Sequence, residues 1–368
     1  MEKVKFNDIY NFQKKSKIKA GDGLKLGEGN FPFFTSSNVL TKSLNEYLFE
    51  EESLIFGTGG LASIHHCDLK FAVSTDCFVT QPRNSKDVFS KYVYYYLSGN
   101  IHILENGFKG AGLKHISKDY LQNIEIPLPP LPTQKAIAAK LDKAQEIISY
   151  NKKLIEKYNQ LTQSLFIDMF GDPVRNEKGW DLLQIKDFGS SRLGKMLDGK
   201  RIIGNNLKPY LRNSNVGWFN FKLDDLLKMD FDEKDKVEFS LKNGDVLMCE
   251  GGEIGRCAIW RNEIEDCYFQ KAIHRIRLNN EYVLPEYFVY MFKNLSDKGG
   301  LNEFKSAATI SHLTGEKLKK MKLPIPPISL QHQFAERIEK IDAQKQMAQE
   351  SLAKSEALFQ SLLQESFK

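Results

Sequence analysis

The sequence predicts an α+β protein with two pseudo-repeated globular domains of mixed α/β structure and two long helices that form an antiparallel coiled coil. Three observations predict this fold: an internal repeat, a heptad pattern in each copy, and short apolar segments upstream of both heptads. Residues 115–170 align without a gap on residues 312–367 at a constant offset of 197, and 14 of the 56 paired positions are identical. The chain is therefore interpreted as two copies of one unit.

Upstream of this block the two copies match less closely, and their offset drifts. Three pairs of segments keep their order: PFFTSSNV from Pro32 with PYLRNSNV from Pro209, Gly59-Gly60 with Gly251-Gly252, and Asp76-Cys77-Phe78 with Asp266-Cys267-Tyr268. Insertions have accumulated in these upstream parts. Each unit is thus predicted to be a variable globular domain followed by an element of fixed length.

The fixed element is predicted to be a long helix. Prolines at 127, 129, 130 and 132 cannot continue a helix or a central strand, and Thr133 is a good N-cap. Apolar residues then recur with 4-3 spacing in both copies, and two matched seams in one chain most simply pair with each other. Asn151 and Lys345 interrupt the seams and are expected to fix their register. The predicted helix–helix seam consists of Ile137, Leu141, Ile148, Ile155, Leu165, Phe334, Ile338, Ile341, Leu352, Phe359 and Leu362.

The globular domains are expected to contain short strands at SLIFG (53–57), KFAVS (70–74), DVLMC (245–249) and HRIRL (274–278), with helical segments near 88–99 and 284–295. Gly171-Asp172-Pro173 is expected to end the first long helix. The predicted division is a first globular domain at 1–131, a first long helix at 132–171, a second globular domain at 172–328 and a second long helix at 329–368.

The amino-acid composition excludes only a few classes of function. The 52 Lys and Arg residues exceed the 47 Asp and Glu residues by five, which permits an acidic partner without requiring one. The five cysteines include no Cys-x-x-Cys pair, so neither a disulfide framework nor a zinc module is indicated, and a reducing cytoplasm is expected. No stretch of the sequence reaches the roughly 18 apolar residues that a membrane helix needs.

Motifs that could carry catalysis are incomplete. Residues 189–195 have the glycine spacing of a phosphate loop, but Met196 stands where a hydroxyl is required. Phe108-Lys109-Gly110-Ala111-Gly112 resembles an S-adenosylmethionine loop, yet no buried strand precedes it. His65-His66-Cys67 lacks further spaced ligands for a metal, and residues 232–236 are better interpreted as a solvated charge run. The chain is therefore predicted to bind rather than to catalyse.

Basic segments recur at the same place in both copies, immediately before the PFFTSSNV and PYLRNSNV segments. Lys and Arg neutralise phosphates, whereas Asn, Ser and Arg also hydrogen-bond to base edges, so these segments suggest a nucleic acid. Exposed charged loops without a special use are the alternative interpretation. The predicted DNA-binding residues are Lys14, Lys15, Lys17, Lys19, Ser36, Ser37, Asn38, Lys109, Lys114, Arg192, Lys195, Lys200, Arg201, Arg212, Asn213, Ser214 and Asn215.

The doubled segment IPLPPLPTQKAIAAKL and LPIPPISLQHQFAERI, each leading into a heptad helix behind a domain with a Gly-Gly loop, resembles the specificity subunit of type I restriction–modification systems. FIDMFGDP (166–173) is also similar to that family. The resemblance implies that each domain reads one half of a bipartite, asymmetric target in double-stranded DNA. It also implies that the helices set the spacer and dock two modification (methyltransferase) subunits.

The same resemblance implies defence against foreign DNA in the cytoplasm, with catalysis left to partners. No cofactor is expected on this chain, while S-adenosylmethionine, ATP and Mg are expected in the modification subunits and in restriction (translocase and nuclease) subunits where these accompany the complex. Two alternatives stay open. One is a fused methyltransferase–specificity enzyme, against which the missing methyltransferase motifs argue, and the other is a coiled-coil scaffold that binds protein partners without reading DNA.

Overall fold

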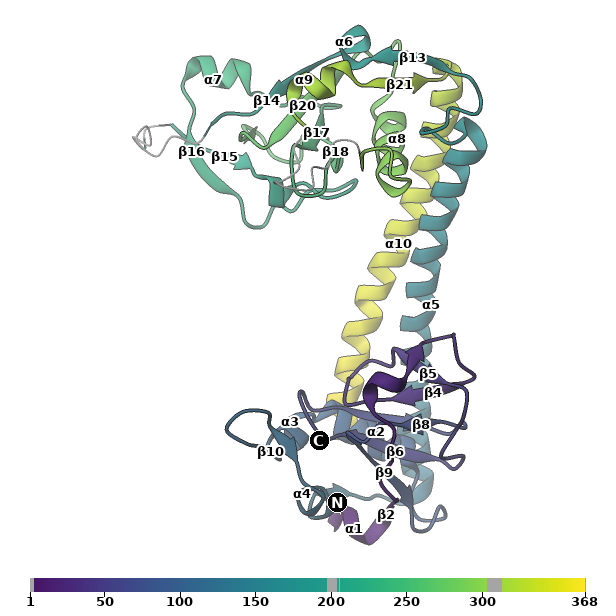
Figure 1. Ribbon diagram of the computed structural model, residues 1–368. Coiled ribbons are helices and arrows are strands. Elements are labelled where there is room, and N and C mark those ends of the chain that lie inside the picture. Colours follow the sequence, from purple (N-terminus) through teal and green to yellow (C-terminus); the bar gives the residue numbers. More distant parts are fainter. Residues whose placement is uncertain (1–2, 197–203, 205, 303–312, 368) are drawn as a thin grey trace. The chain divides into compact units, whose positions relative to one another are not determined.

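The computed structural model describes residues 3–196, 204, 206–302 and 313–367 (Figure 1). The chain divides into two compact units. The first unit consists of residues 1–153 and 348–368, and the second consists of residues 154–347. Each unit therefore combines one globular domain with one part of each long helix.

The two long helices are α5 (Leu131–Phe170) and α10 (Ile328–Ser366). Each begins directly after the Pro-Pro segment of its copy, as the sequence predicted. Helix α5 ends where Gly171 adopts a φ of +77°, a conformation that glycine reaches without steric cost. All 18 positions of the two predicted 4-3 patterns are buried or half-buried, including every predicted seam residue.

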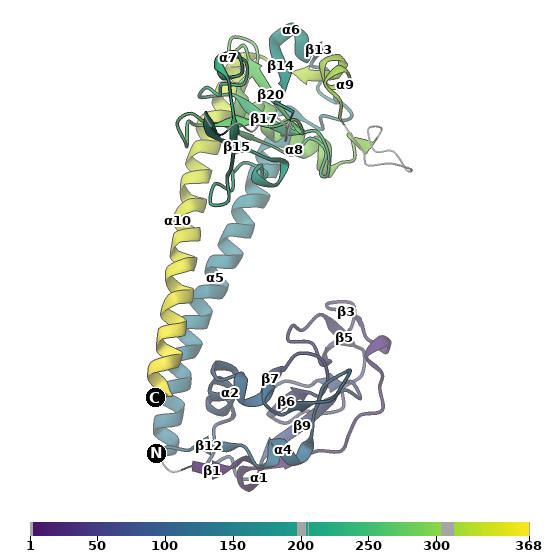
Figure 2. The same ribbon diagram turned by 90° about the vertical axis from the view of Figure 1, so that its left-hand side faces the viewer.

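Helices α5 and α10 run antiparallel within the first unit (Figure 2). Leu141 of α5 packs in one apolar cluster with Leu363 of α10. Ten residues further along α5, Asn151 Nδ2 donates a hydrogen bond to Ser351 Oγ at 3.1 Å. Residue numbers thus rise on one helix as they fall on the other, and the polar seam residue Asn151 has a specific partner, as its predicted role in the register requires.

The first domain stacks two sheets and a helix. Its central sheet has the antiparallel order β2-β9-β6-β7, and a second sheet has the order β3-β5-β4-β8. Helix α2 and the second sheet lie on opposite sides of the central sheet (Figure 2). Leu54 and Phe56 pack on α2, whereas Ile55 packs against the second sheet, because successive strand residues point to opposite faces. These elements are β2 (Tyr10–Phe12), β3 (Leu24–Lys25), β4 (Phe31–Phe34), β5 (Lys42–Leu44), β6 (Ser53–Gly57), β7 (Ile64–Cys67), β8 (Ala72–Val73), β9 (Cys77–Pro82) and α2 (Ser90–Gly99).

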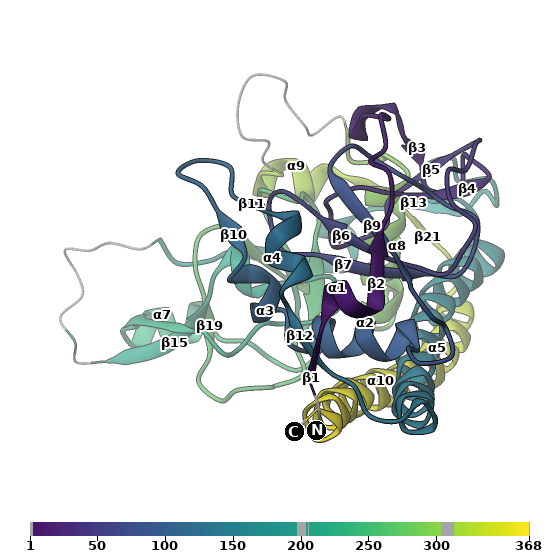
Figure 3. The ribbon, with the colours of Figure 1, turned by 90° about the horizontal axis from the view of Figure 1, so that it is seen from below.

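Smaller elements complete this domain. Strand β1 pairs with β12, and β10 pairs with β11 in a hairpin that projects from the domain beside α3 and α4 (Figure 3). The bounds are β1 (Lys3–Lys5), α1 (Phe6–Ile9), η1 (Ala20–Asp22), α3 (His102–Glu105), β10 (Phe108–Lys109), β11 (His115–Ile116), α4 (Lys118–Gln122) and β12 (Glu125–Pro127).

The second domain repeats this plan. Its central sheet has the order β14-β20-β17-β18, and one face of this sheet packs on α8. Its second sheet has the order β16-β15-β19. Strand β13 pairs with β21. The bounds are β13 (Asp181–Gln184), α6 (Ile185–Phe188), β14 (Gly189–Leu193), β15 (Leu207–Leu211), η3 (Asn213–Asn215), β16 (Leu227–Asp230), α7 (Glu233–Glu238), β17 (Val246–Cys249), β18 (Cys257–Ile259), β19 (Tyr268–Phe269), β20 (Ile273–Leu278), α8 (Pro285–Asp297), α9 (Gly315–Lys320) and β21 (Lys322–Ile325).

The strand registers match the two copies residue by residue and correct one predicted pairing. Phe34 pairs in parallel with Val73, and Leu211 pairs in parallel with Phe269, so the PFFTSSNV and PYLRNSNV segments are equivalent. Gly57 lies opposite Cys77, and Cys249 lies opposite Ile273.

Gly59-Gly60 and Gly251-Gly252 therefore occupy the same place, as the sequence predicted. Cys77, in contrast, corresponds to Ile273 and not to Cys267, which precedes β19. The predicted match of Asp76-Cys77-Phe78 with Asp266-Cys267-Tyr268 is therefore wrong. It relied on two residues that are identical by chance, because the sequence does not reveal the register of the strands.

A buried glutamine fastens each long helix to its domain in the same way. Gln134 accepts a hydrogen bond from Phe89 N at 2.9 Å and donates to the Asp87 and Pro129 carbonyls at 2.9 and 2.8 Å. Gln331 accepts from Leu284 N and donates to the Tyr282 and Pro326 carbonyls, each at 2.9 Å. Both side chains are fully buried and use donor and acceptor groups of one amide to tie three backbone groups together. We call these two side chains the glutamine clasps.

Candidate nucleic-acid interface

Loops from five parts of the first domain gather at one edge of its central sheet. The end of β6 lies beside the start of β9, and Thr58 N donates to the Asp76 carbonyl at 2.9 Å. The chain that leaves β2 stays alongside, because Thr75 N donates to the Ile18 carbonyl at 2.8 Å. We call this surface the first edge; it comprises residues 13–19, 35–38, 57–63, 74–76 and 108–116.

The Ser/Asn segment is held at this edge by its backbone. Ser63 Oγ donates to the Ser36 carbonyl at 3.1 Å, and His65 Nε2 donates to the Ser37 carbonyl at 2.8 Å. Burial lowers the pKa of His65, an effect that the hydrogen bond to the Ser37 carbonyl opposes. The backbone is thus fixed while the Ser37 and Asn38 side chains remain exposed and the Ser36 side chain is half-buried.

The β10–β11 hairpin brings the remaining predicted residues of this domain to the same edge. Gly59 and His115 form an antiparallel bridge, and Ile116 N donates to the Thr58 carbonyl at 3.1 Å. Lys109 and Lys114 on this hairpin are exposed. All nine predicted DNA-binding residues of the first domain therefore lie on the first edge, although they come from three separate stretches of sequence.

The lysines of the first edge have no acidic partner in the part of the chain that the structure describes. Within the described ranges, Lys14, Lys17, Lys19, Lys109 and Lys114 form no ion pair. Lys15 Nζ lies 5.3 Å from the centroid of the Phe78 ring, a contact that leaves its charge uncompensated. An edge that carries six such cations can attract a polyanion.

The second domain builds the equivalent edge from the ends of β14 and β17 and the starts of β18 and β20. Glu250 N donates to the Ala272 carbonyl at 2.9 Å, and Asn213 Nδ2 donates to the Gly251 carbonyl at 2.9 Å. Ala272 has a φ of +140°, a conformation that side chains other than glycine rarely adopt, so the backbone is strained here. We call this surface the second edge; it comprises residues 192–196, 211–215, 249–257 and 269–273.

Four of the five cations of the second edge are paired, whereas Lys271 is exposed and forms no ion pair among the described residues. Lys195 forms an ion pair with Asp235 and donates to the Asp230 carbonyl at 2.6 Å, and only 22% of its side chain is exposed. Arg192 forms an ion pair with Glu238. These side chains hold their own loops together, in contrast to the lysines of the first edge.

The Asn/Ser segment of the second edge is also used internally. Arg212 donates to the Asp225 carboxylate at 2.7 Å, and Asn213 accepts from Arg256 at 2.8 Å. Asn215 is fully buried, and its amide donates to the Lys222 carbonyl and to Asp225.

Asn215 is therefore a structural residue, and its predicted contact with DNA is corrected: a side chain without exposed surface and with its hydrogen bonds satisfied cannot reach a base. Ser214 remains exposed. The predicted residues Lys200 and Arg201 lie outside the described residues.

The sequence interpretation missed Arg256, Trp218 and Glu253, which organise the second edge. Trp218 Nε1 donates to Glu253 at 2.6 Å, and Arg256 also pairs with Glu253 at 3.5 Å. Glu253 follows Gly251-Gly252 as Leu61 follows Gly59-Gly60, so the doubled Gly-Gly signal could have drawn attention to both positions.

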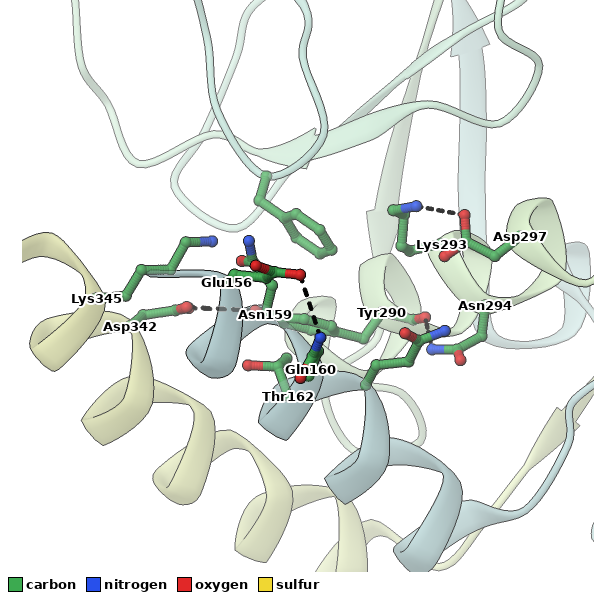
Figure 4. A pocket seen from close by; sticks show the side chains of 12 residues that line it. Glu156, Asn159, Gln160, Thr162, Tyr290, Lys293, Asn294, Asp297, Asp342 and Lys345 are labelled. Atoms are coloured by element: carbon green, nitrogen blue, oxygen red, sulfur yellow. Dashed lines mark hydrogen bonds and ion pairs between the residues drawn. The ribbon is translucent and has the colours of Figure 1, made fainter. Parts of the chain in front are cut away.

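A cavity of about 440 Å³ lies in the second unit between α5, α8 and α10 (Figure 4). Thr162 lines it, and the Tyr290 hydroxyl donates to Asp342 at 3.3 Å beside it. Burial raises the pKa of Asp342, an effect that Lys345 opposes. In the first unit Phe359 occupies the position equivalent to Thr162, and its ring centroid lies 6.2 Å from that of Tyr95. The cavity thus lies where the other copy places an aromatic ring.

Other sequence candidates have structural roles. His66 pairs with Glu52 at 2.8 Å, and no group of three or more metal-ligating side chains occurs among the described residues. Residues 189–193 form strand β14 instead of a phosphate loop, and the charge run forms helix α7 with Asp232 as its N-cap. Within the described part of the chain, no helix is long and apolar enough to cross a membrane.

Comparison with known proteins identifies the family. Residues 1–160 and 177–356 match the family model described as type I restriction modification DNA specificity domain. A putative type I restriction enzyme specificity subunit of Haemophilus influenzae is 25% identical over 333 residues, which cover 85% of this chain and 80% of the relative. The EcoKI specificity subunit of Escherichia coli is 23% identical over 362 residues, 91% of this chain and 77% of that one.

Solved structures share the fold. The crystal structure of the type I restriction–modification S subunit of M. genitalium superposes with a TM-score of 0.67 at 15% identity and covers 100% of this chain and 96% of that one. A chain from a study of complex assembly and conformational transition of a type I system gives a TM-score of 0.58 at 15% identity and covers 100% of this chain and 97% of that one. The repeat, the paired helices and the match of the family model to both copies together place this chain in the family of type I restriction–modification specificity subunits.

Proposed function

We propose that each domain of this specificity subunit reads one half of a bipartite, asymmetric sequence in double-stranded DNA. The observation that carries this proposal is that the two edges have the same backbone plan and different side chains. Equivalent loops with unlike surfaces suit the reading of two unlike half-sites, because base identity is read by side chains at groove edges.

On the first edge we assign phosphate contacts to Lys14, Lys15, Lys17, Lys19, Lys109 and Lys114. Ser37 and Asn38 are assigned to base edges, since their side chains are exposed on a backbone that is held in place, and Ser36 supports them. On the second edge Ser214, Lys271 and the exposed part of Arg192 are contacts that the described residues offer. Arg212, Asn213 and Lys195 position the loops that carry them, and Lys200 and Arg201 stay in the proposed contact set on sequence grounds.

We propose that α5 and α10 set the spacer between the half-sites and dock two modification (methyltransferase) subunits, with restriction subunits added in some complexes. Paired helices of 40 and 39 residues support a ruler role, because helix length is fixed at about 1.5 Å per residue. Catalysis, and with it S-adenosylmethionine, ATP and Mg, belongs to those partners in this proposal, which places the complex in the cytoplasm.

Adenine-methylation mapping tests the proposal. DNA from cells that express this chain with its modification subunit is compared with DNA from cells that lack this chain. A bipartite motif that appears only with the chain supports the proposal and names the target. A complex that forms yet adds no motif would favour the scaffold alternative instead.

The ruler role has its own test. One heptad is added or removed at matched places in α5 and α10, and the methylated motif is mapped again. The expected result is a changed spacer with both half-sites retained, because a whole heptad preserves the seam. Changed half-site bases would contradict the assignment of reading to the domains and measuring to the helices.

A further inference from the structure

Two leucines stand in solvent on the first edge. Leu61 is 79% exposed and Leu113 is 78% exposed, and among the large hydrophobic residues of the described ranges only Val237 exceeds them. A single exposed leucine is ordinary, but two on neighbouring loops of a candidate binding surface need an explanation.

The bridge between Gly59 and His115 places the loops that carry these leucines beside each other. Leu61 lies two residues after Gly59, and Leu113 lies two residues before His115. In an antiparallel pair those two steps lead in the same direction along the chain, so the two loops leave the bridge on the same side. Gly60 at φ +81° and Gly110 at φ +147° allow the tight turns that present the leucines.

The surroundings favour DNA as the occupant over a protein. Residues 57–63 and 108–118 contain no acidic residue, and the second stretch contains Lys109, Lys114 and Lys118. Lys118 Nζ lies 5.1 Å from the centroid of the Phe12 ring at the end of β2. Asp76 is the one acidic residue of the first edge, against six lysines, so the edge has a net positive charge. An apolar tip on such an edge matches a duplex, whose phosphates flank an apolar stack of bases.

We propose that Leu61 and Leu113 form an apolar wedge that enters the base stack of the half-site read by the first domain. This inference rests on the proposed function and names side chains that act on bases there, while the lysines hold phosphates. Side chains such as leucine unstack base steps and kink the duplex when they insert.

Among the described residues, the Leu61 half of the wedge belongs to the first domain alone, and the position equivalent to Leu113 lies outside them. The residue equivalent to Leu61 is Glu253, whose carboxylate accepts from Trp218 and pairs with Arg256. A carboxylate in that place would be repelled by the phosphates and cannot insert between bases. The two half-sites are therefore expected to be deformed unequally.

The test uses the complex with the modification subunit and DNA that carries the mapped target. 2-Aminopurine replaces single bases of either half-site, away from the adenine that is methylated, since flipping of that base would also raise fluorescence. The expected result is a rise of fluorescence at one step of the half-site read by the first domain. In the Leu61→Ala, Leu113→Ala double variant this rise disappears, and binding weakens roughly tenfold or more.

Salt dependence separates the wedge from a phosphate contact. The double leucine variant should leave the slope of log affinity against log salt unchanged, whereas Lys114→Ala should reduce the slope by about one. Leu69→Ala is the matched control: Leu69 is 64% exposed but follows the opposite end of β7. Leu61→Met with Leu113→Met should restore the fluorescence change, because methionine also inserts.

The proposal is overturned if the intact complex binds its mapped target without any fluorescence rise, or if the rise persists in the alanine double variant. It is also overturned if fewer variant chains assemble with the modification subunit while the complexes that do assemble bind DNA with unchanged affinity. The leucines would then contact protein instead of DNA. None of these outcomes touches the proposed function, which is tested separately by methylation mapping and by the heptad variants.

Discussion

The first and second edges have the same loops at the same strand ends but use their charges in opposite ways. On the first edge Lys17 and its neighbours have no acidic partner within the described ranges, and Leu61 projects from the Gly-Gly loop. On the second edge Lys195 and Arg192 are paired with carboxylates, and Glu253 takes the place of Leu61. Duplication has preserved the backbone frame and left the surface free to change.

The attachment of the helices shows the reverse relationship. The two glutamine clasps keep the same donors and acceptors in both copies, down to the equivalent backbone groups. A buried amide with three backbone partners tolerates no substitution without leaving one of them unpaired. The contacts that attach each helix to its domain are thus the same in both copies, whereas the side chains of the two edges differ.

The glutamine clasps should give the largest effects, and equal ones. Gln134→Ala and Gln331→Ala are each expected to lower the free energy of unfolding by about 2–5 kcal/mol, because buried N–H and C=O groups lose their partners. Urea unfolding of the full chain measures both. Gln145→Ala and Gln333→Ala, at exposed positions of the same helices, are the controls. If a clasp variant lost no more stability than its control, the glutamine clasps would not be essential for attaching the helices to the domains.

Removal of single cations should affect the two edges differently. Lys17→Ala is expected to leave stability unchanged and to lower the salt slope of specific DNA binding by about one. Lys195→Ala should instead destabilise the second domain by about 1–3 kcal/mol, since Asp235 loses its partner at a site where its side chain is 18% exposed. Filter binding at several salt concentrations, with thermal unfolding in parallel, distinguishes the two. If both variants had the same salt slope and the same stability, the predicted difference between the two edges would be wrong.

The cavity beside Thr162 distinguishes the two helix–domain junctions. Phe359→Ala is expected to cost about 1–3 kcal/mol of stability, because a half-buried ring that packs on Tyr95 is lost. Thr162→Ala should cost no more than about 0.5 kcal/mol, since its hydroxyl donates only to the Tyr158 carbonyl of its own helix. Leu358→Ala, at a position 52% exposed, is the control for helix propensity. Similar losses at 162 and 359 would mean that the cavity is filled.

The smallest effect concerns pH. The folded-state pKa of Asp342 is raised by burial, so the protonated acid favours the folded state and stability from this group is lost as pH rises through the raised pKa. Asp342→Asn mimics the protonated form and should gain no more than about 0.5 kcal/mol at pH 7, a small figure because the side chain is partly exposed. Unfolding midpoints at pH 4 and pH 7 check the sign. If Asp342→Asn were less stable than the parent at pH 7 but not at pH 4, the predicted sign would be wrong.

Much of the fold could be predicted because the repeat and the heptads are local patterns. Pro130 and Pro327 mark where the long helices begin, and the 4-3 spacing identifies their buried faces. The edge residues were harder to predict. The basic segments before PFFTSSNV and PYLRNSNV look alike in sequence. Among the described residues, however, the lysines of the first have no acidic partner, whereas Arg192, Lys195 and Arg212 of the second are paired. The partners of the paired set, such as Glu238 and Asp235, lie about 40 residues away.

By itself, the sequence determined the duplication, the two long helices with their seams, and the places where basic and polar residues gather. Only the tertiary structure decided which strands are equivalent, that Asn215 is buried, and that Leu61 and Leu113 project from neighbouring loops. The physical reason is that periodicity and proline act on neighbouring residues, whereas exposure and charge pairing depend on contacts between residues far apart in the chain.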